Sequence, residues 1–242
     1  MSEYISGRNP VKELLRAGQK TVNKILLSNQ ARGSVIEEIV KLAKERKIPI
    51  HNVPPIKLDK LSKENNQGVV AEITSASYLD IDELLKKVQS DAKPFIVILD
   101  NIEDPHNLGA IIRSAVTFGA NGIVIGKWRS AGLTDTVSRT SAGASEHIPI
   151  ARVTNIAECV SQLKEKGFWV AGAEGNNKPI EEERFSFPLA LVIGGEGKGI
   201  SRLVKERCDI LVSIAQTSKI SSLNASCAAA VILYEIYKQK AR

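Results

Sequence analysis

The first 75 residues alternate between short apolar runs and helical patterns. The apolar runs have the length of strands, and between them apolar residues recur every three to four positions, as on one face of a helix. In residues 34–47, Ile36, Ile39 and Ala43 fall on one such face, and Ser34 can cap its start. We expect strands at 22–27, from 48 and at 69–73, and helices at 9–18, 34–47 and 56–61. Together they predict a small α/β domain over residues 1–75.

A different pattern begins after a linker at residues 76–93, which is mostly polar and holds one short predicted helix at 80–88. From residue 94 to 242, strands are expected at 95–99, 122–125, 148–151, 168–171, 189–193 and 210–212. Because helical patterns separate most of these strands, neighbouring strands should run parallel and be covered by helices. The second domain is therefore predicted to be an open parallel α/β sheet.

Composition narrows the class of protein. A hydrophobic content of 43% in 242 residues is enough for two cores. No apolar stretch approaches the ~18 residues of a membrane helix, and the first residues lack the apolar run of a signal peptide. Cys159, Cys208 and Cys227 are dispersed and show neither disulfide nor metal-ligand spacing. We expect a cytoplasmic protein with no membrane segment and no metal site.

Charge is unevenly distributed along the chain. Residues 1–75 hold 13 Lys and Arg against 8 Asp and Glu, whereas residues 76–242 hold 20 against 19. Almost all of the net charge of +6 therefore lies in the first third. A basic module beside a near-neutral one suggests that the first binds a polyanion, such as a nucleic acid, and the second processes it. A solvated basic surface without a partner is the alternative that charge alone leaves open.

Three polar stretches follow predicted strands or precede helices in the second domain. The first, at 100–109, contains Asn107 and runs into a helix that carries Arg113. The second is a glycine loop at 194–201 with Glu196 at its centre, and the third, at 221–224, contains Ser222 and Asn224. Loops at the carboxyl ends of parallel strands are where α/β proteins bind ligands. We take Asn107 as a possible helix cap, and glycine as the residue that lets the backbone approach a ligand.

The glycine loop matches no common phosphate, dinucleotide or hydrolase motif. Lys198 is followed by Gly199 and not by Ser or Thr, so it is not a P-loop. The glycine spacing is wrong for a dinucleotide fingerprint, and no hydrolase Gly-x-Ser-x-Gly motif is present. His51, His106 and His147 lack metal-ligand spacing.

The three stretches together resemble the SpoU (TrmH) family of RNA ribose 2′-O-methyltransferases. Its motifs are Asn-x-Gly-x-x-x-Arg, Gly-x-Glu-x-x-Gly and Ser-Leu-Asn-x-Ser. This chain has Asn-Leu-Gly-Ala-Ile-Ile-Arg at 107–113, Gly-Gly-Glu-Gly-Lys-Gly at 194–199 and Ser-Leu-Asn-Ala-Ser at 222–226. At the front, Gly-Arg-Asn-Pro-Val at 7–11 and Asn-Gln-Gly-Val-Val-Ala at 66–71 resemble the family's substrate-binding extension.

The resemblance implies a SPOUT-type parallel sheet with a C-terminal trefoil knot, preceded by an RNA-binding domain similar to ribosomal protein L30e. It implies S-adenosylmethionine as cofactor, bound in the knotted loops mainly by backbone groups, and a homodimer formed through the knotted domain. By position, the cofactor would be bound by Gly194, Gly195, Ile214, Leu223 and the loop around Ala173.

The resemblance also assigns catalytic roles. Arg113 would act as general base or would hold a substrate phosphate; a guanidinium with a pKa above about 12 favours the second role. Glu196 would brace Asn107 and the glycine loop, while Ser222 and Asn224 would fix the last turn through side-chain to backbone bonds. His106 could act as a base by its chemistry, but a surface or turn role suits it better.

RNA recognition would begin in the first domain, where Arg8, Lys12 and Arg16 lie near one predicted helix and could contact phosphates. Aromatic residues make up only 5% of the chain, so no stacking platform for bases is evident. Relatives with this extension commonly methylate a guanosine of 23S rRNA, which is the expected substrate. The alternative substrate is a guanosine of tRNA. The alternative function is that of a non-catalytic RNA-binding or ribosome-assembly protein. The presence of Asn107, Arg113, Glu196 and Asn224 argues for an enzyme.

Overall fold

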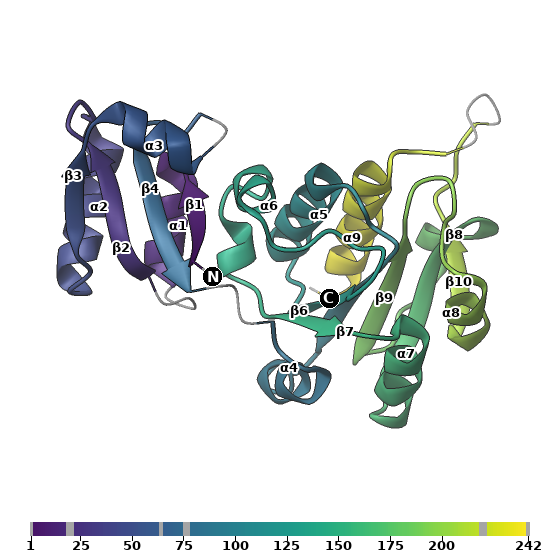
Figure 1. Ribbon diagram of the computed structural model, residues 1–242. Coiled ribbons are helices and arrows are strands. Elements are labelled where there is room, and N and C mark those ends of the chain that lie inside the picture. Colours follow the sequence, from purple (N-terminus) through teal and green to yellow (C-terminus); the bar gives the residue numbers. More distant parts are fainter. Residues whose placement is uncertain (1, 18–21, 63–64, 75–77, 218–221, 241–242) are drawn as a thin grey trace. The chain divides into compact units, whose positions relative to one another are not determined.

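The structure is a computed structural model of the chain, and it describes residues 2–17, 22–62, 65–74, 78–217 and 222–240. The chain forms two compact units (Figure 1). Unit 1 consists of Met1–Ser77 and Gly132–His147, and unit 2 consists of Tyr78–Ala131 and Ile148–Arg242. Within the described residues, no helix combines the length and the apolar character needed to cross a membrane.

Unit 1 is built on a four-stranded sheet with the order β1-β4-β2-β3. β4 pairs antiparallel with β1 and β2, whereas β2 and β3 are parallel. The strands are β1 (Ser2–Ser6), β2 (Val22–Ser28), β3 (Ile50–Val53) and β4 (Val69–Thr74), and the helices are α1 (Arg8–Ala17), α2 (Ser34–Glu45) and α3 (Pro55–Leu61). The predicted strands and helices of the first domain are all present, whereas β1 was not predicted.

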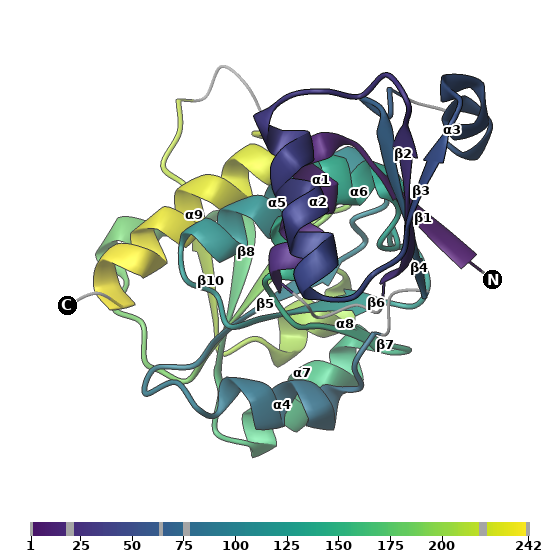
Figure 2. The same ribbon diagram turned by 90° about the vertical axis from the view of Figure 1, so that its left-hand side faces the viewer.

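The alternation of side chains along β2 explains the layers of unit 1. Ile25 and Leu27 pack with the buried faces of α1 and α2, while Leu26 packs with Leu58 of α3 on the opposite face. Figure 2 shows α1 and α2 on one side of the sheet and α3 on the other. Both faces of this small sheet are therefore covered.

A segment far along the chain completes unit 1. It contains α6 (Asp135–Thr140) and a 3₁₀ turn (Ala144–Glu146). The backbone N–H and the hydroxyl of Ser6 donate to the two carboxylate oxygens of Asp135, at 2.8 and 2.7 Å. The His147 ring nitrogen Nε2 lies 2.8 Å from Glu13 Oε2. The sequence analysis had placed residues 132–147 in the second domain, because contacts between distant segments leave no local pattern.

Unit 2 is built on a six-stranded sheet with the order β10-β8-β9-β5-β6-β7, and every pairing in it is parallel. The predicted parallel α/β sheet is confirmed. Its strands are β5 (Phe95–Asp100), β6 (Gly122–Gly126), β7 (Ile150–Val153), β8 (Trp169–Pro179), β9 (Leu189–Gly194) and β10 (Ile210–Ser213). β8 extends well beyond the predicted run, and β10 pairs with both of its ends across a register shift at Leu211/Val212.

Helices cover the sheet of unit 2. One cluster of buried residues joins the sheet to α4 (Ile81–Val88), α7 (Ile156–Glu165) and α8 (Arg202–Arg207). The long α9 (Ala225–Lys240) packs against α5 (Pro105–Thr117), and Figure 1 shows these two helices side by side. The segment predicted as a linker helix forms α4, and Leu84, Leu85 and Val88 of this helix are buried in the core. It is therefore a structural part of unit 2.

The substitution Asp135→Ala tests whether residues 132–147 stabilise β1. Loss of the carboxylate leaves the two Ser6 donors without their partner, and hydrogen bonds to charged groups contribute about 1.5–3 kcal/mol each. We expect amide hydrogen exchange in peptides covering residues 2–6 and 132–147 to become roughly tenfold faster or more. Asp82→Ala, which removes an exposed first-turn carboxylate of α4, is the matched control. Unchanged protection in both segments would contradict the assignment.

Candidate functional site: two adjoining cavities at the carboxyl edge of the parallel sheet

The carboxyl ends of β5 and β9 lie side by side, with Asp100 paired to Gly194. The loops that follow these strands are joined through Asp100. Its backbone C=O accepts from Gly195 N at 2.9 Å, and its carboxylate accepts from Ser201 N at 2.7 Å. Asp100, whose side chain is buried, therefore fixes one end of the glycine loop through its carbonyl and the other through its carboxylate.

Two glycines allow this loop to pack against its surroundings. A Cβ on Gly195 would lie 2.1 Å from the carbonyl oxygen of Asn101, and a Cβ on Gly194 would lie 2.2 Å from the carbonyl carbon of Gly199. Gly199 has a φ of +61°, which favours glycine. The glycines at 194 and 195 are thus required because backbone meets backbone. The sequence analysis attributed glycine in this loop to the approach of a ligand alone.

Three polar side chains from the three predicted motifs form one hydrogen-bonded group, which we call the Asn-Glu-Asn cluster. Asn107 Nδ2 donates to Glu196 Oε1 at 3.0 Å, and Asn224 Nδ2 donates to Asn107 Oδ1 at 3.1 Å and to Glu196 Oε1. Residues up to 117 positions apart in the chain therefore meet at one point. Glu196 accepts from both amides.

Each asparagine of the cluster is positioned by a helix start. Asn107 lies in the first turn of α5 and is buried, but Asp104 is the cap of this helix, and its carboxylate accepts from His106 N at 2.9 Å. The expectation that Asn107 caps α5 is wrong, and its side chain is thereby available to Glu196. Asn224 does cap α9, because its Oδ1 accepts from Ser226 N at 2.9 Å. Its side-chain N–H groups remain directed to the cluster.

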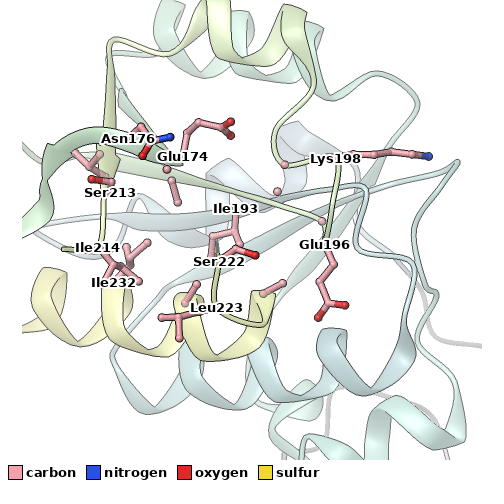
Figure 3. Close-up of a pocket in the computed structure, with 18 of the residues that line it drawn as sticks. Glu174, Asn176, Ile193, Glu196, Lys198, Ser213, Ile214, Ser222, Leu223 and Ile232 are labelled. Atoms are coloured by element: carbon pink, nitrogen blue, oxygen red, sulfur yellow. The ribbon is translucent and has the colours of Figure 1, made fainter. Parts of the chain in front are cut away.

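A cavity of about 330 Å³ opens beside the cluster (Figure 3). All five residues predicted to bind a cofactor line it: Ala173, Gly194, Gly195, Ile214 and Leu223. Ser222 and Glu196 line it as well. Glu174, in the predicted loop around Ala173, also lines it. Sequence reasoning missed other lining side chains, notably Asn176, Val212, Ser213 and Ile232. These residues lie on β8, β10 and α9, and only the position of Asn176 shortly after the predicted strand end at 171 could have indicated one of them.

Glu174 gives this cavity a second carboxylate. Its Oε1 accepts from Lys205 Nζ at 2.5 Å, and its Oε2 lies 3.4 Å from Ile200 N. Glu196, in the glycine loop, is the other carboxylate that lines this cavity, and its side chain points away from that of Lys198 (Figure 3). The cavity wall therefore combines apolar side chains with two carboxylates, a lining that suits an organic cation with an apolar part.

A second cavity of about 270 Å³ adjoins the first. It is lined by Asn101, Ile102, Glu103, Asp104, Asn107, Gly195, Glu196 and Lys198. Gly195, Glu196 and Lys198 line both cavities, so the glycine loop is their common wall. Molecules bound in the two cavities would therefore both lie against this loop.

Comparison with known proteins agrees with this geometry. The family model described as "SpoU rRNA Methylase family" matches residues 94–234, and the model described as "RNA 2'-O ribose methyltransferase substrate binding" matches residues 4–79. The chain belongs to the SpoU rRNA methylase family. The family resemblance in the sequence is thereby confirmed, and the protein is an RNA ribose 2′-O-methyltransferase of the SpoU (TrmH) family.

Named relatives extend over the whole chain. A Bacillus subtilis (strain 168) protein, YacO, carries the name TrmH family tRNA/rRNA methyltransferase and is 44% identical over 98% of this chain and 96% of its own length. A Staphylococcus haemolyticus protein of the same family name is 44% identical over 98% and 95%. The crystal structure of the SpoU methyltransferase AviRb from Streptomyces viridochromogenes, in complex with the cofactor AdoMet, is 26% identical with a TM-score of 0.85, covering 99% of this chain and 91% of that one.

The structure does not bring every predicted SpoU residue into the cluster. Arg113 lies on α5, six positions after Asn107, and its side chain is exposed. Arg113 lines neither cavity, and among the described residues no hydrogen bond links its side chain to the Asn-Glu-Asn cluster. On the surface of α5 it can reach a group outside the two cavities.

The three basic residues predicted to bind RNA lie in unit 1 and already have partners. Arg8 Nε donates to the carbonyl of Gln67 at 3.1 Å. Lys12 and Arg16 both pair with Glu38, Lys12 at 3.9 Å. Two of the three positive charges are therefore balanced by a neighbouring carboxylate.

In the described part of the chain, no group of three or more His, Cys, Asp or Glu residues is arranged to hold a metal ion. Burial raises the pKa of Cys159 and of Cys208 to about 12, so both thiols are protonated at neutral pH and are poor nucleophiles.

The substitution Gly195→Ala should destabilise the protein. The added methyl group would overlap the carbonyl of Asn101, and the fixed backbone around Asp100 leaves little room for a shift. We expect the free energy of unfolding to fall by about 1–3 kcal/mol, measured by denaturant unfolding. Gly175→Ala is the matched control, because nothing lies within 4 Å of its Cβ position and its φ is not in the left-handed region. Equal losses in both variants would show that the close approach is unimportant.

Proposed function

We propose that the protein transfers the methyl group of S-adenosylmethionine to the ribose 2′-hydroxyl of a guanosine in 23S rRNA. The observation that carries this proposal is the pair of cavities that share the glycine loop, with the Asn-Glu-Asn cluster beside their common wall. A group transfer between two bound molecules requires such adjoining sites. Ribose methylation, rather than another transfer, follows from membership of the SpoU family.

The larger cavity suits S-adenosylmethionine. Ile193, Ile214, Leu223 and Ile232 offer an apolar surface for the adenine, and the loop backbone offers N–H and C=O groups for the polar parts. The cofactor supplies, when bound, a methyl group on a positively charged sulfur, and a nearby carboxylate favours a cation. AviRb, whose fold matches this chain, was crystallised with AdoMet.

The protein's own groups would act mainly by positioning. The 2′-oxygen must approach the methyl carbon in line with the departing sulfur, and its proton must leave as the new C–O bond forms. We assign the substrate ribose to the smaller cavity, which Asn107 lines and where Glu196 lies at the shared wall. In this proposal Asn224 and Glu196 orient Asn107, and Ser222 shapes the last turn of the cofactor cavity.

Arg113 is proposed to hold a phosphate of the substrate RNA. An exposed guanidinium on α5 can form a fork-shaped pair with phosphate oxygens without entering either cavity. Because a guanidinium stays protonated, holding a phosphate is the role that suits it better than accepting a proton. By holding the phosphate of the substrate nucleotide, Arg113 would orient the ribose of that nucleotide.

The same proposal includes a homodimer that forms through unit 2. Val231, Tyr234 and Tyr237 of α9 are all exposed, and they recur at the three-residue spacing of one helix face. Phe118 lies beside Tyr234 and Tyr237, with ring centroids 5.6 and 6.1 Å away. Burying these rings against a second copy would remove a costly exposed apolar patch.

Further parts of the proposal follow from the family resemblance. We propose a trefoil knot that includes the glycine loop, a cytoplasmic location and an RNA-binding role for residues 1–75, with Arg8 among the contacts. The backbone packing at Gly194 and Gly195 is what a tightly threaded loop needs. Lys12 and Arg16 would have to exchange Glu38 for a phosphate, whereas Arg8 is held only by Gln67 in the described residues.

Methyl transfer into separate pools of unmodified ribosomal RNA and tRNA tests the proposal. We expect label from S-adenosylmethionine in large-subunit RNA, recovered after digestion as 2′-O-methylguanosine. Label in tRNA alone would keep the reaction and replace the substrate; the tRNA/rRNA names of the relatives make this the second candidate. No label in either pool, with no cofactor binding, would assign the protein to non-catalytic RNA binders.

The substitution Arg113→Ala separates phosphate holding from cofactor binding. Removing the guanidinium should lower kcat/KM for RNA by roughly a hundredfold or more, while the Kd for S-adenosylmethionine stays nearly unchanged, because Arg113 lies outside the cofactor cavity. Arg113→Lys should keep part of the activity. Arg202→Ala, at an exposed arginine of α8, is the control. A large loss of cofactor affinity in Arg113→Ala would contradict the assignment.

A further inference from the structure

The loop after β6 lies next to the smaller cavity. β5 and β6 are adjacent parallel strands, so the loops that follow them leave the sheet at the same edge. Ala131 N donates to the carbonyl of Ile102 at 2.8 Å, and Ile102 lines the smaller cavity. Residues 127–131, which we call the β6 loop, are therefore joined through Ala131 to a residue that lines the proposed ribose site.

Trp128 stands out in this loop. Its side chain is 70% exposed, more than any other large hydrophobic residue in the described part of the chain. Lys127 and Arg129 on either side of it are also exposed, and Lys127 Nζ lies 5.4 Å from the centre of the Trp128 ring. Exposing an indole to water is unfavourable. Packing within the fold therefore does not explain why a tryptophan is exposed between two cations.

The loop holds the indole on a fixed base. Lys127 N donates to the carbonyl of Val153 at 2.7 Å, Arg152 donates to the carbonyl of Lys127 at 3.2 Å, and Ala131 is joined to Ile102. Both ends of the β6 loop are thus hydrogen-bonded to neighbouring segments. A ligand that binds to Trp128 has little loop entropy to overcome.

We propose that Trp128 stacks on a base of the RNA next to the nucleotide whose ribose occupies the smaller cavity, with Lys127 and Arg129 contacting the adjacent phosphates. This inference rests on the proposed function of the site. An aromatic ring flanked by cations is the usual surface for an unpaired base, because the ring binds the base face and the cations bind the backbone. The low aromatic content had suggested that no such surface exists, yet a single well-placed ring is enough for one base.

RNA fits this position better than a protein partner does. The exposed apolar surface is one side chain with a positive charge on each side, whereas a protein contact needs a larger, continuous patch. The other tryptophan gives a useful contrast, because Trp169 is partly buried and packs against Phe185 with ring centroids 5.8 Å apart. Only Trp128 presents its ring to solvent.

Trp128→Ala and Trp128→Phe test the proposal by RNA binding and by kinetics. Unmodified large-subunit RNA fragments and an unmodified tRNA transcript serve as probes. We expect RNA binding to weaken by about tenfold in Trp128→Ala, because base–aromatic stacking is lost. Trp128→Phe should keep most of the affinity, because the phenyl ring can still stack on a base. The KM for RNA should rise in Trp128→Ala, while kcat and the Kd for S-adenosylmethionine change little. Leu203→Ala, at an exposed apolar residue of α8, is the control.

Fluorescence gives a readout that does not depend on methyl transfer. In a Trp169→Phe background, the remaining indole should be quenched when RNA binds, because a stacked base quenches tryptophan emission. Unchanged emission together with unchanged RNA affinity in Trp128→Ala would overturn the proposal. So would a change in association state with no change in RNA binding, which would assign Trp128 to a protein contact. Quenching by RNA in a protein that methylates neither pool would keep the stacking of Trp128 on a base, while the proposed function and the placement of that base beside the ribose site would fail.

Discussion

The backbone after β9 lies directly against the backbone after β5, and the site depends on this contact. A Cβ on Gly195 would lie within 2.1 Å of the Asn101 carbonyl oxygen, so a side chain cannot fit between the two loops. Asp100 holds both ends of the glycine loop, because its buried carboxylate accepts from Ser201 N and its carbonyl accepts from Gly195 N. The loop is consequently a thin, fixed partition with a cavity on each side.

The fixed loop also explains why Glu196 can organise two asparagines. The carboxylate accepts from Asn107 and Asn224, which come from the starts of the packed helices α5 and α9. A carboxylate has several acceptor sites and no donor, so both amides must turn their N–H groups toward it. Asn107 Oδ1 then accepts from Asn224, which fixes the orientation of the Asn107 amide. Local helix geometry and one acceptor thus determine the arrangement of the whole cluster.

The sequence predicted much of this architecture because its signals are local. All six strands of the parallel sheet occur close to where periodicity indicated, and the five residues that the family resemblance assigns to a cofactor line one cavity. Contacts between distant segments left no such signal. β1 was missed because Ser2–Ser6 is short and polar on one face, and its pairing depends on β4 and on Asp135. The cap of α5 was assigned to Asn107 although Asp104 also fits the pattern, and spacing could not distinguish between them.

The set of chain segments that makes up unit 1 also depends on contacts between distant residues, which the sequence pattern does not reveal. The substrate-binding family model ends at residue 79, yet residues 132–147 belong to the same compact unit. Asp135 satisfies two donors of Ser6, and a Cβ on Gly143 would lie 2.4 Å from Cβ of Glu13, so the later segment packs directly on β1 and α1. A buried donor left without its acceptor destabilises a fold. Unit 1 is therefore stabilised by a chain segment that follows α5, and its boundaries are set by packing rather than by sequence order.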